Sequence, residues 1–421
     1  MMGAAKRFIL TGSIILTLSN VAVRLLSYLF RVAMGRLLSP YEYGILNLAL
    51  PLQFMIILLT SAGIAPSIAK YVSDAQGDRE RLSRLTASVI YYYTIGGLLL
   101  GAIFFILARP IGTLLFGDVN AVLPLQLSAL AMPFGIVVSV FTGIFQGMRK
   151  AHFMSGALLF EQVLRVVFAV LLVVLGFGAV GGIAGSTLGF ILAIPFSIVL
   201  FKTLNLELGR RSYTVFKEVF WFSVPTSITA LSSFLLAYAD ILFIGYFMSP
   251  GDVGIYSAAS PASRLIFAFT MAFYAVLIPT VSEASAKGGK RAVKKYFKIA
   301  LLSLSAVVLP ATIFSLLFSK QIVTMLFTDV YSQAVPSFEI LVVGAAFLSL
   351  FMTNSGIFQG LGKPGTPMKI LLLFASVDIL LNLILIPGYG IEGAAFATAF
   401  ASIGAGLVST ALLAEYLYAA K

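Results

Sequence analysis

The sequence has 421 residues, of which 60% are hydrophobic and only 10% are charged. An ordinary soluble domain is roughly 45–50% apolar and about 25% charged, so this composition excludes a soluble globule and predicts a polytopic helical membrane protein. Cysteine is absent and His152 is the single histidine, which excludes thiol chemistry and multi-histidine metal sites. We therefore expect no metal and no cofactor. The net charge of +12 is assigned to membrane topology and not to nucleic-acid binding.

Apolar stretches separated by polar residues or by Gly and Pro predict twelve membrane-spanning helices. Such stretches are long enough, at 1.5 Å per residue, to cross a hydrocarbon layer of roughly 30 Å. The first stretch follows basic residues, as in a signal peptide, but it contains arginines, so we interpret it as an uncleaved helix. The expected spans are 8–35, 43–69, 86–108, 121–147, 153–175, 182–202, 216–246, 254–281, 297–318, 334–360, 368–386 and 392–416.

The basic residues predict the orientation of the chain. Twelve spans place both termini on one face, and most of the 28 Lys and Arg residues fall on that face. The opposite face carries only Arg36, Arg109 and Lys320, and four arginines lie inside helices. By the positive-inside rule, we expect a multi-pass protein of the cell membrane with both termini in the cytoplasm.

Short sequences recur along the chain at a nearly constant offset. GIFQGMRK at 143–150 returns as GIFQGLGK at 356–363, an offset of 213 residues, and the turn at 38–40 matches 248–250 at an offset of 210. The repeated sequences occur in the same order in both halves of the chain, which indicates a duplicated six-helix unit. Because six is even, both copies cross the membrane in the same direction, and we expect two six-helix lobes related by a pseudo-twofold axis along the membrane normal.

The duplication predicts the domain organisation. Residues 1–203 form an N-terminal six-helix lobe, residues 204–213 a cytoplasmic linker and residues 214–421 a C-terminal six-helix lobe. The connecting segments are short, so we expect no extramembrane catalytic domain and no enzyme. Two facing bundles enclose a cleft, the architecture in which a transporter alternates access to a midplane site. Glycines at 176–189 predict close helix packing and not a phosphate loop, because the pattern GxxxxGK[ST] is missing.

Arginines inside the expected helices are the candidate substrate-binding residues. A charge at mid-bilayer costs roughly 2.5–3.5 kcal/mol on insertion scales, so it usually faces a polar interior. Arg24 and Arg31 lie two turns apart on one face of the first helix, and Arg264 lies on the eighth helix, in the other lobe. No acidic residue occurs between Lys6 and Arg36. A cationic cleft suits an anionic substrate, because guanidinium groups bind phosphate oxygens bidentately.

Polar and aromatic neighbours complete the expected site: Tyr28, Asn20 and Gln53 are predicted to hydrate sugars or to stack on them. The alternative interpretation is that the arginines pair with buried carboxylates or extend to the interface. Asp240 is one such carboxylate, because it aligns with Phe30, next to Arg31, at the offset of 210.

Further charges are candidates for coupling or gating. Glu161 and Arg165 have the i,i+4 spacing and order of a self-neutralising pair. Asp378 is the counterpart of Arg165 at the offset of 213, which suggests an ion pair between the lobes that breaks on opening. Alternatively, Asp378 or Glu161 takes up a proton or a sodium ion as the coupling site.

The doubled six-helix plan, the two GIFQG sequences, the LSPYEYG turn and the arginines of the first and eighth helices resemble a known family. They resemble the oligosaccharide flippases of the multidrug/oligosaccharidyl-lipid/polysaccharide exporter (MOP) superfamily, over essentially the whole chain. The resemblance implies a V-shaped pair of lobes that moves a polyprenyl-pyrophosphate-linked saccharide from the cytoplasmic to the outer leaflet. It also implies that Arg24, Arg31 and Arg264 line the central cavity. Twelve spans, without two additional C-terminal helices, favour the O-antigen type over the lipid II branch.

The sequence thus predicts an alternating-access flippase for a polyprenyl- or dolichyl-linked saccharide. We expect a monomer that contacts membrane lipids and works beside an envelope glycan polymerase or ligase, with no nucleic-acid partner. The main alternative is a cation-coupled multidrug exporter of the same superfamily. In such exporters the first helix often carries an aspartate, and the first helix of this chain has none. A membrane-embedded glycosyltransferase or ligase and a non-transporting scaffold are further alternatives.

Overall fold

The computed structural model describes residues 2–59 and 63–418. Within these ranges every regular element is a helix and no strand occurs, which confirms the predicted all-helical class. The chain divides into two compact units, Met1–Tyr238 and Ala239–Lys421. We call them the N-terminal unit and the C-terminal unit and describe each by itself.

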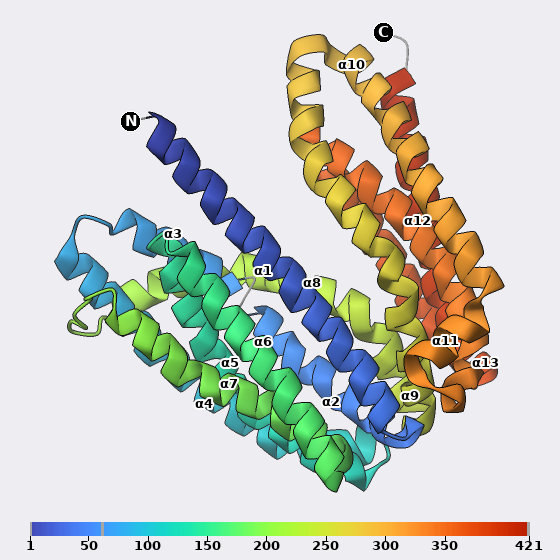
Figure 1. Ribbon diagram of the computed structural model, residues 1–421, viewed down its shortest axis with the longest axis horizontal. Helices are drawn as coiled ribbons and strands as arrows, with labels where there is room; N and C mark the ends of the chain where they lie inside the picture. The colour runs from blue at the N-terminus through green and yellow to red at the C-terminus, as the bar shows by residue number, and fades with distance from the viewer. Residues whose placement is uncertain (1, 60–62, 419–421) are drawn as a thin grey trace. The chain divides into compact units, whose positions relative to one another are not determined.

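The N-terminal unit consists of helices joined by short turns (Figure 1). Short π or 3₁₀ segments occupy Ile111–Leu115, Val119–Ala121 and Val173–Phe177. Residues 60–62, inside the predicted span 43–69, lie outside the described residues. The helices are α1 (Met2–Leu37), α2 (Pro40–Leu59), α3 (Ala65–Asp74), α4 (Arg79–Pro110), α5 (Val122–Gly147), α6 (Ala151–Leu172), α7 (Gly178–Lys202) and α8 (Tyr213–Phe247), whose last part belongs to the C-terminal unit.

The C-terminal unit continues with helices only, in the part that is described. Two 3₁₀ segments, Arg264–Ile266 and Asp329–Ala334, separate some of them. The helices are α9 (Pro250–Ser263), α10 (Phe267–Leu317), α11 (Ser319–Phe327), α12 (Val335–Gly360) and α13 (Gly365–Tyr418).

Part of the described helical structure has membrane-spanning length and composition. Six segments of the described chain are long and apolar enough to cross a bilayer, and two of them, with 52 and 54 residues, each contain two of the predicted spans. The count of twelve therefore stays a prediction. The six segments are Arg79–Leu115, Val119–Gly147, Ala151–Lys202, Gly289–Leu317, Asp329–Gly360 and Gly365–Tyr418.

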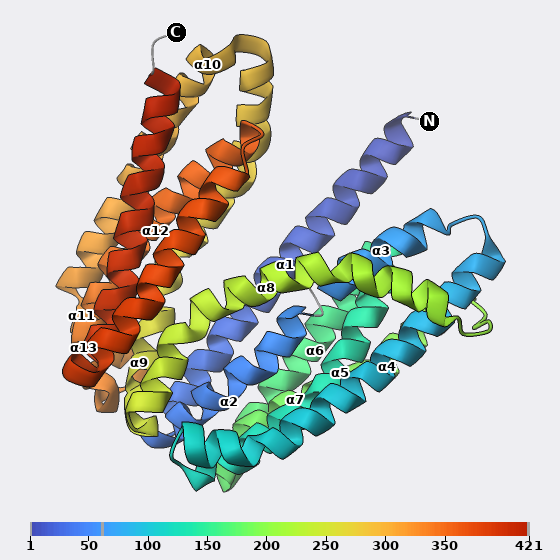
Figure 2. The same ribbon diagram turned by 180° about the vertical axis from the view of Figure 1, so that it is seen from behind.

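The two longest helices of the C-terminal unit are each broken at a glycine. The backbone leaves the helical conformation at Gly289 (φ 56°) in α10 and at Gly390 (φ 59°) in α13, a region that favours glycine because a Cβ is strained there. Figures 1 and 2 show α10 turned back on itself at such a break. Both breaks fall between predicted spans, at 281–297 and 386–392, so the sequence located these turns correctly.

The predicted eighth span, 254–281, is interrupted. Helix α9 ends at Ser263, a 3₁₀ turn covers Arg264–Ile266, and α10 begins at Phe267. Arg264 therefore lies in a helix break and not within a continuous helix, which corrects the expectation. Pro261 gives the physical reason, because its missing N–H removes a helical hydrogen bond one turn before the break.

The repeated sequences take the same local structure in both units. After the first GIFQG sequence, the N–H of Lys150 donates to the carbonyl of Phe145 at 2.8 Å, and after the second, the N–H of Lys363 donates to the carbonyl of Phe358 at 2.8 Å. The residue before each of these lysines has positive φ: Arg149 at 58° and Gly362 at 73°. The two repeated sequences thus form equivalent helix C-termini in the two units.

The predicted linker is attached to α4. The N–H of Ser212 donates to Ser88 Oγ at 2.8 Å, and that of Gly209 donates to the Ser83 carbonyl at 3.3 Å. The boundary between the two units lies further on, between Tyr238 and Ala239. The lobe boundaries derived from the duplication stay a prediction.

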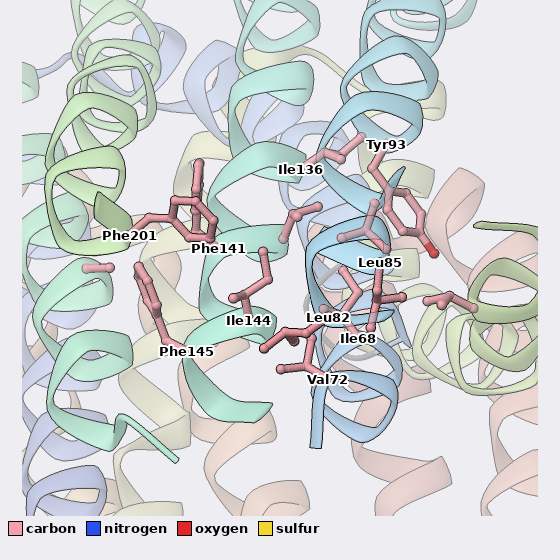
Figure 3. Close-up of a cluster of buried hydrophobic side chains, with 14 of the residues drawn as sticks. Ile68, Val72, Leu82, Leu85, Tyr93, Ile136, Phe141, Ile144, Phe145 and Phe201 are labelled. Carbon is pink, nitrogen blue, oxygen red and sulfur yellow. The ribbon is translucent and has the colours of Figure 1, made fainter. Parts of the chain in front are cut away.

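The core of the N-terminal unit surrounds α5. The most apolar part of α5 is mostly buried, at 78%, whereas the most apolar part of α4 is only 17% buried. Helix α4 therefore presents a broad apolar surface outward, as expected toward lipid. Aromatic and branched side chains from α3, α4, α5 and α7 meet in the core (Figure 3). They include Ile68, Val72, Leu82, Leu85, Tyr93, Ile136, Phe141, Ile144, Phe145 and Phe201.

Candidate functional site

A cavity lined by arginines lies within the N-terminal unit. Its volume is about 250 Å³. Helices α1, α2, α6 and α8 line it, with two arginines, Arg31 and Arg165, among otherwise mostly aromatic or apolar side chains. The Arg31 Nη2 group donates a hydrogen bond to the Tyr238 hydroxyl at 3.2 Å. The full lining is Ser27, Phe30, Arg31, Leu50, Phe54, Arg165 and Tyr238.

Arg165 is held by its own helix and by two rings. Its Nη1 lies 3.8 Å from Glu161 Oε1, one turn earlier on α6, so the predicted i,i+4 pair is present. The guanidinium carbon lies 4.7 Å from the centre of the Phe54 ring and 5.5 Å from that of Phe30, within cation–π range. Arg165 is only 5% exposed, and its Nε has no hydrogen-bond partner in the described part of the chain. Arg31 is close enough for its charge to act on Arg165.

Glycines of α7 set the position of α6 and hence of Arg165. A Cβ added to Gly189 would lie 2.9 Å from the backbone of Arg165, and one added to Gly185 would lie 2.1 Å from the backbone nitrogen of Ala169. The two helices therefore touch through their backbones, as small residues spaced four apart allow. The prediction that the glycines at 176–189 serve close packing is confirmed at these positions.

The remaining predicted residues of α1 form a stripe that leads to the cavity. Asn20 and Arg24 are exposed, and Tyr28 and Arg31 are half-buried. Tyr28 has a buried hydroxyl oxygen without a hydrogen-bond partner among the described residues. The structure thus brings Arg31 to the cavity and leaves Arg24 on an exposed part of α1.

Gln53 is placed differently from the expected sugar contact. It is fully buried, and its Oε1 accepts a hydrogen bond from Ser186 of α7 at 3.1 Å. Its amide nitrogen Nε2 has no partner within the described ranges. In this structure Gln53 links α2 to α7 inside the N-terminal unit, and its sugar-binding role stays a prediction.

The C-terminal unit contains a buried acidic pair. Asp240 is 3% exposed and Asp378 is 6% exposed. The Tyr256 hydroxyl donates to Asp240 Oδ2 at 2.7 Å, and the N–H of Ile241 donates to Asp240 Oδ1 at 2.8 Å. The charge of Arg264 acts on both carboxyl groups. Asp240 and Arg264 thus belong to one electrostatic cluster of the C-terminal unit.

Polar oxygens surround the second carboxyl group of this cluster. Thr398 and Asn382 lie beside Asp378. Asp378 Oδ1, Asn382 Oδ1 and Thr398 Oγ1 are buried and have no partner at hydrogen-bond distance among the described residues. Buried oxygen atoms without a hydrogen-bond partner can bind a proton or a hard cation such as sodium.

Sequence reasoning missed three members of these clusters. Tyr238, which binds Arg31, precedes Asp240 by two residues in an apolar segment, and this polar neighbourhood was the available signal. Tyr256 and Thr398 had no local signal, because single hydroxyls are common in membrane helices and only the fold brings these two beside carboxylates.

Solved structures at low sequence identity show which fold this chain shares. The structure titled lipid II flippase MurJ, inward closed conformation, superposes with a TM-score of 0.78 at 16% identity over 95% of this chain and 87% of that one. An inward-facing multidrug resistance MATE transporter of the MOP superfamily superposes with a TM-score of 0.72 at 17% identity, over 93% and 94%. The fold is therefore that of the MOP superfamily transporters.

Sequence comparison shows the family to which the chain belongs. Residues 9–285 match the family described as polysaccharide biosynthesis protein, and residues 225–384 match the MatE family. A relative in Haloferax volcanii, named probable low-salt glycan biosynthesis flippase Agl15, is 23% identical over 406 residues, which cover 96% of this chain and 83% of the relative. The protein belongs to the polysaccharide biosynthesis protein family, as its sequence motifs suggested.

Proposed function

We propose that this protein is a flippase that moves a polyprenyl- or dolichyl-(pyro)phosphate-linked oligosaccharide from the cytoplasmic to the outer leaflet by alternating access. In this proposal the chain crosses the cell membrane twelve times, as two six-helix lobes with both termini in the cytoplasm. Family membership and the flippase name of the Haloferax volcanii relative support the assignment. The protein acts by binding and conformational change and not by covalent catalysis.

The observation that carries the proposal is the polar face of α1, on which the charged residues are all cationic. Asn20, Arg24, Tyr28 and Arg31 follow one another at helical spacing, and α1 has no acidic residue to neutralise them. A basic stripe that ends at a cavity favours an anionic ligand, and phosphate groups are the anions that guanidinium forks bind best.

Each residue has a distinct role in the proposal. Arg24, Arg31 and Arg264 hold the pyrophosphate, while Asn20, Tyr28 and Gln53 contact sugars. The prenyl tail stays in the lipid during movement. Membrane lipids surround the protein, which works as a monomer beside an envelope glycan polymerase or ligase.

Coupling is assigned to the buried acidic residues. Asp378, supported by Asp240, takes up a proton or a sodium ion in one conformational state and releases it in the other. The unpartnered oxygens at Asp378 support this role. The Glu161–Arg165 pair is assigned to gating.

Complementation tests the substrate-binding residues. In a strain that lacks its own glycan-lipid flippase, Arg24→Ala and Arg264→Ala are expected to abolish complementation while membrane levels of the protein stay normal. Arg109→Ala is the matched control, because Arg109 is an exposed arginine in the last turn of α4 and has no role in the proposed site. Full activity of both Arg24→Ala and Arg264→Ala would contradict the proposed site.

The MatE match and the MATE-like fold favour one second function, cation-coupled export of drugs. Uptake of a cationic dye into inverted vesicles distinguishes the two functions. Uptake that does not depend on Arg24 would favour the exporter, whereas no dye uptake together with glycan-lipid complementation would favour the flippase.

A further inference from the structure

Positive charge is concentrated at the turn of α10 around Gly289 (Figure 1). Residues 283–298, which we call the basic turn, contain six basic residues and one acidic residue, Glu283. Lys287 forms an ion pair with Glu283. The other five basic residues form no ion pair with a carboxylate in the described part of the chain: Lys290, Arg291, Lys294, Lys295 and Lys298.

Membrane topology alone does not account for this concentration. The equivalent segment of the N-terminal unit, residues 70–85, also turns at a glycine of positive φ, Gly77 at 101°, but it contains four basic and three acidic residues. One basic and one acidic residue of that segment, Arg84 and Glu80, form an ion pair. In the predicted topology both turns lie on the same side of the membrane, so the positive-inside rule acts on both alike. The excess of charge at the basic turn therefore has another cause.

Two tyrosine rings of α13 hold ammonium groups at the basic turn. Lys290 Nζ lies 4.8 Å from the centre of the Tyr416 ring, and Nζ of Lys363, just after α12, lies 3.7 Å from the same centre. One helical turn after Lys290, Lys294 Nζ lies 3.5 Å from the centre of the Tyr418 ring. Cation–π contacts thus gather three ammonium groups, and none of them is paired with a carboxylate among the residues that the structure describes. Like charges gathered in this way repel one another, and a shared anion relieves the repulsion.

An exposed apolar surface follows the basic turn along α10. Lys295, Ile299 and Leu302 are successive residues on one face of the helix, and all three are exposed. The segment Gly289–Leu317 is long and apolar enough to cross a bilayer, so the cations lie at the end of a membrane-spanning segment, where lipid headgroups are found. A cationic group followed by an apolar surface matches a phospholipid, in which acyl chains follow an anionic headgroup. A free phosphate ion or an acidic protein segment would use only the cations.

We propose that the basic turn of α10, together with the adjoining ends of α12 and α13, is a binding site for an anionic phospholipid of the bilayer. The headgroup phosphate contacts the ammonium groups of Lys290, Lys294 and Lys363, and the acyl chains lie along the exposed apolar face of α10. The proposed topology places this lipid in the cytoplasmic leaflet, whose surface is negatively charged. The site lies within the C-terminal unit and uses none of the residues assigned above to the transported substrate.

The test measures lipid binding to the purified full-length protein by native mass spectrometry, with phosphatidylglycerol as the anionic probe and phosphatidylcholine as the neutral one. The wild-type protein is expected to bind phosphatidylglycerol more tightly. A variant that combines Lys290→Gln, Lys294→Gln and Lys363→Gln should bind phosphatidylglycerol about a hundredfold more weakly, because each lysine near a lipid surface contributes about fivefold. Equal affinity of the wild-type protein for the two lipids would overturn the proposal.

The equivalent turn of the N-terminal unit provides a control with the same change in net charge. A variant that combines Arg79→Gln, Arg81→Gln and Arg84→Gln removes three exposed cations there and should leave the affinity for phosphatidylglycerol unchanged. A loss as large as that of the lysine variant would show that binding follows the net charge of the protein, which contradicts a site at the basic turn.

The tyrosine rings separate an ordered site from diffuse attraction, because replacing them changes no charge. Tyr416→Leu should weaken phosphatidylglycerol binding, by about two- to fivefold for each cation–π contact that is lost, whereas Tyr416→Phe keeps the ring and should bind as the wild type does. Should Tyr416→Leu fail to fold, Tyr418→Leu takes its place, since Tyr418 is exposed and contacts Lys294. Wild-type affinity in the folded leucine variant would overturn the proposal.

Competition with a soluble polyglutamate peptide examines an acidic protein as the partner. The peptide offers negative charge without acyl chains and should not displace phosphatidylglycerol. Displacement by the peptide at or below the lipid concentration would assign the basic turn to an acidic protein segment and overturn the lipid assignment. Phosphatidylglycerol binding at the basic turn would persist even if complementation shows that the protein is not a flippase, so failure of either proposal can be recognised separately.

Discussion

The contact between α6 and α7 can be tested by adding one methyl group. In Gly185→Ala the new Cβ would lie 2.1 Å from the backbone nitrogen of Ala169, whereas ordinary contact begins at 3.4 Å, so the two helices must separate by more than an ångström. Overpacking costs about 1–3 kcal/mol, and alanine gains only roughly 0.5–1 kcal/mol over glycine in a helix. We therefore expect a net loss of stability.

The matched control is Gly156→Ala in α6. Nothing lies within 4 Å of a Cβ added at Gly156, so this variant should keep the propensity gain and become slightly more stable. Thermal unfolding of both purified variants, followed by circular dichroism in one detergent, gives the comparison. A Gly185→Ala protein as stable as Gly156→Ala would refute the backbone contact.

Two further predictions concern the C-terminal helix ends and the acidic cluster. Gly362→Ala should destabilise the protein by about 1 kcal/mol, because a Cβ is strained at its φ of 73°. Arg149→Gly, at the equivalent position with φ of 58°, should not destabilise it. Thermal unfolding of the two variants measures both effects. Asp378→Asn should remove the dependence of transport on a proton or sodium gradient, measured in liposomes with and without each gradient, and an unchanged dependence would exclude Asp378 as the coupling residue.

Local sequence rules predicted the features that depend on neighbours along the chain. Composition indicated helical membrane segments, and the i,i+4 spacing predicted the contact between Glu161 and Arg165. The breaks in α10 and α13 fall between predicted spans, at Gly289 and Gly390. Both glycines adopt backbone angles that few other residues tolerate.

Features that join distant segments could not be read in this way. The hydrogen bond from Arg31 to Tyr238 connects residues 207 positions apart, so only the folded structure reveals it. Pro261 permits a bend in the eighth span, but the position of a proline alone does not show whether neighbouring groups satisfy the lost hydrogen bond, so the 3₁₀ turn at Arg264 could not be placed from the sequence. Gln53 is polar in an apolar helix, and spacing did not distinguish a partner in α7 from a ligand.

The central claim is that this protein moves a glycan-bearing lipid across the bilayer by way of its arginines. The most direct measurement is the rate at which a fluorescent polyprenyl-pyrophosphate-linked saccharide, placed in one leaflet of liposomes containing the purified protein, becomes inaccessible to a membrane-impermeant quencher. We predict rapid loss of quenching with the wild-type protein and rates near those of protein-free liposomes for Arg24→Ala and Arg31→Gln. Equal rates in wild-type and protein-free liposomes, across both cation gradients, would contradict the account.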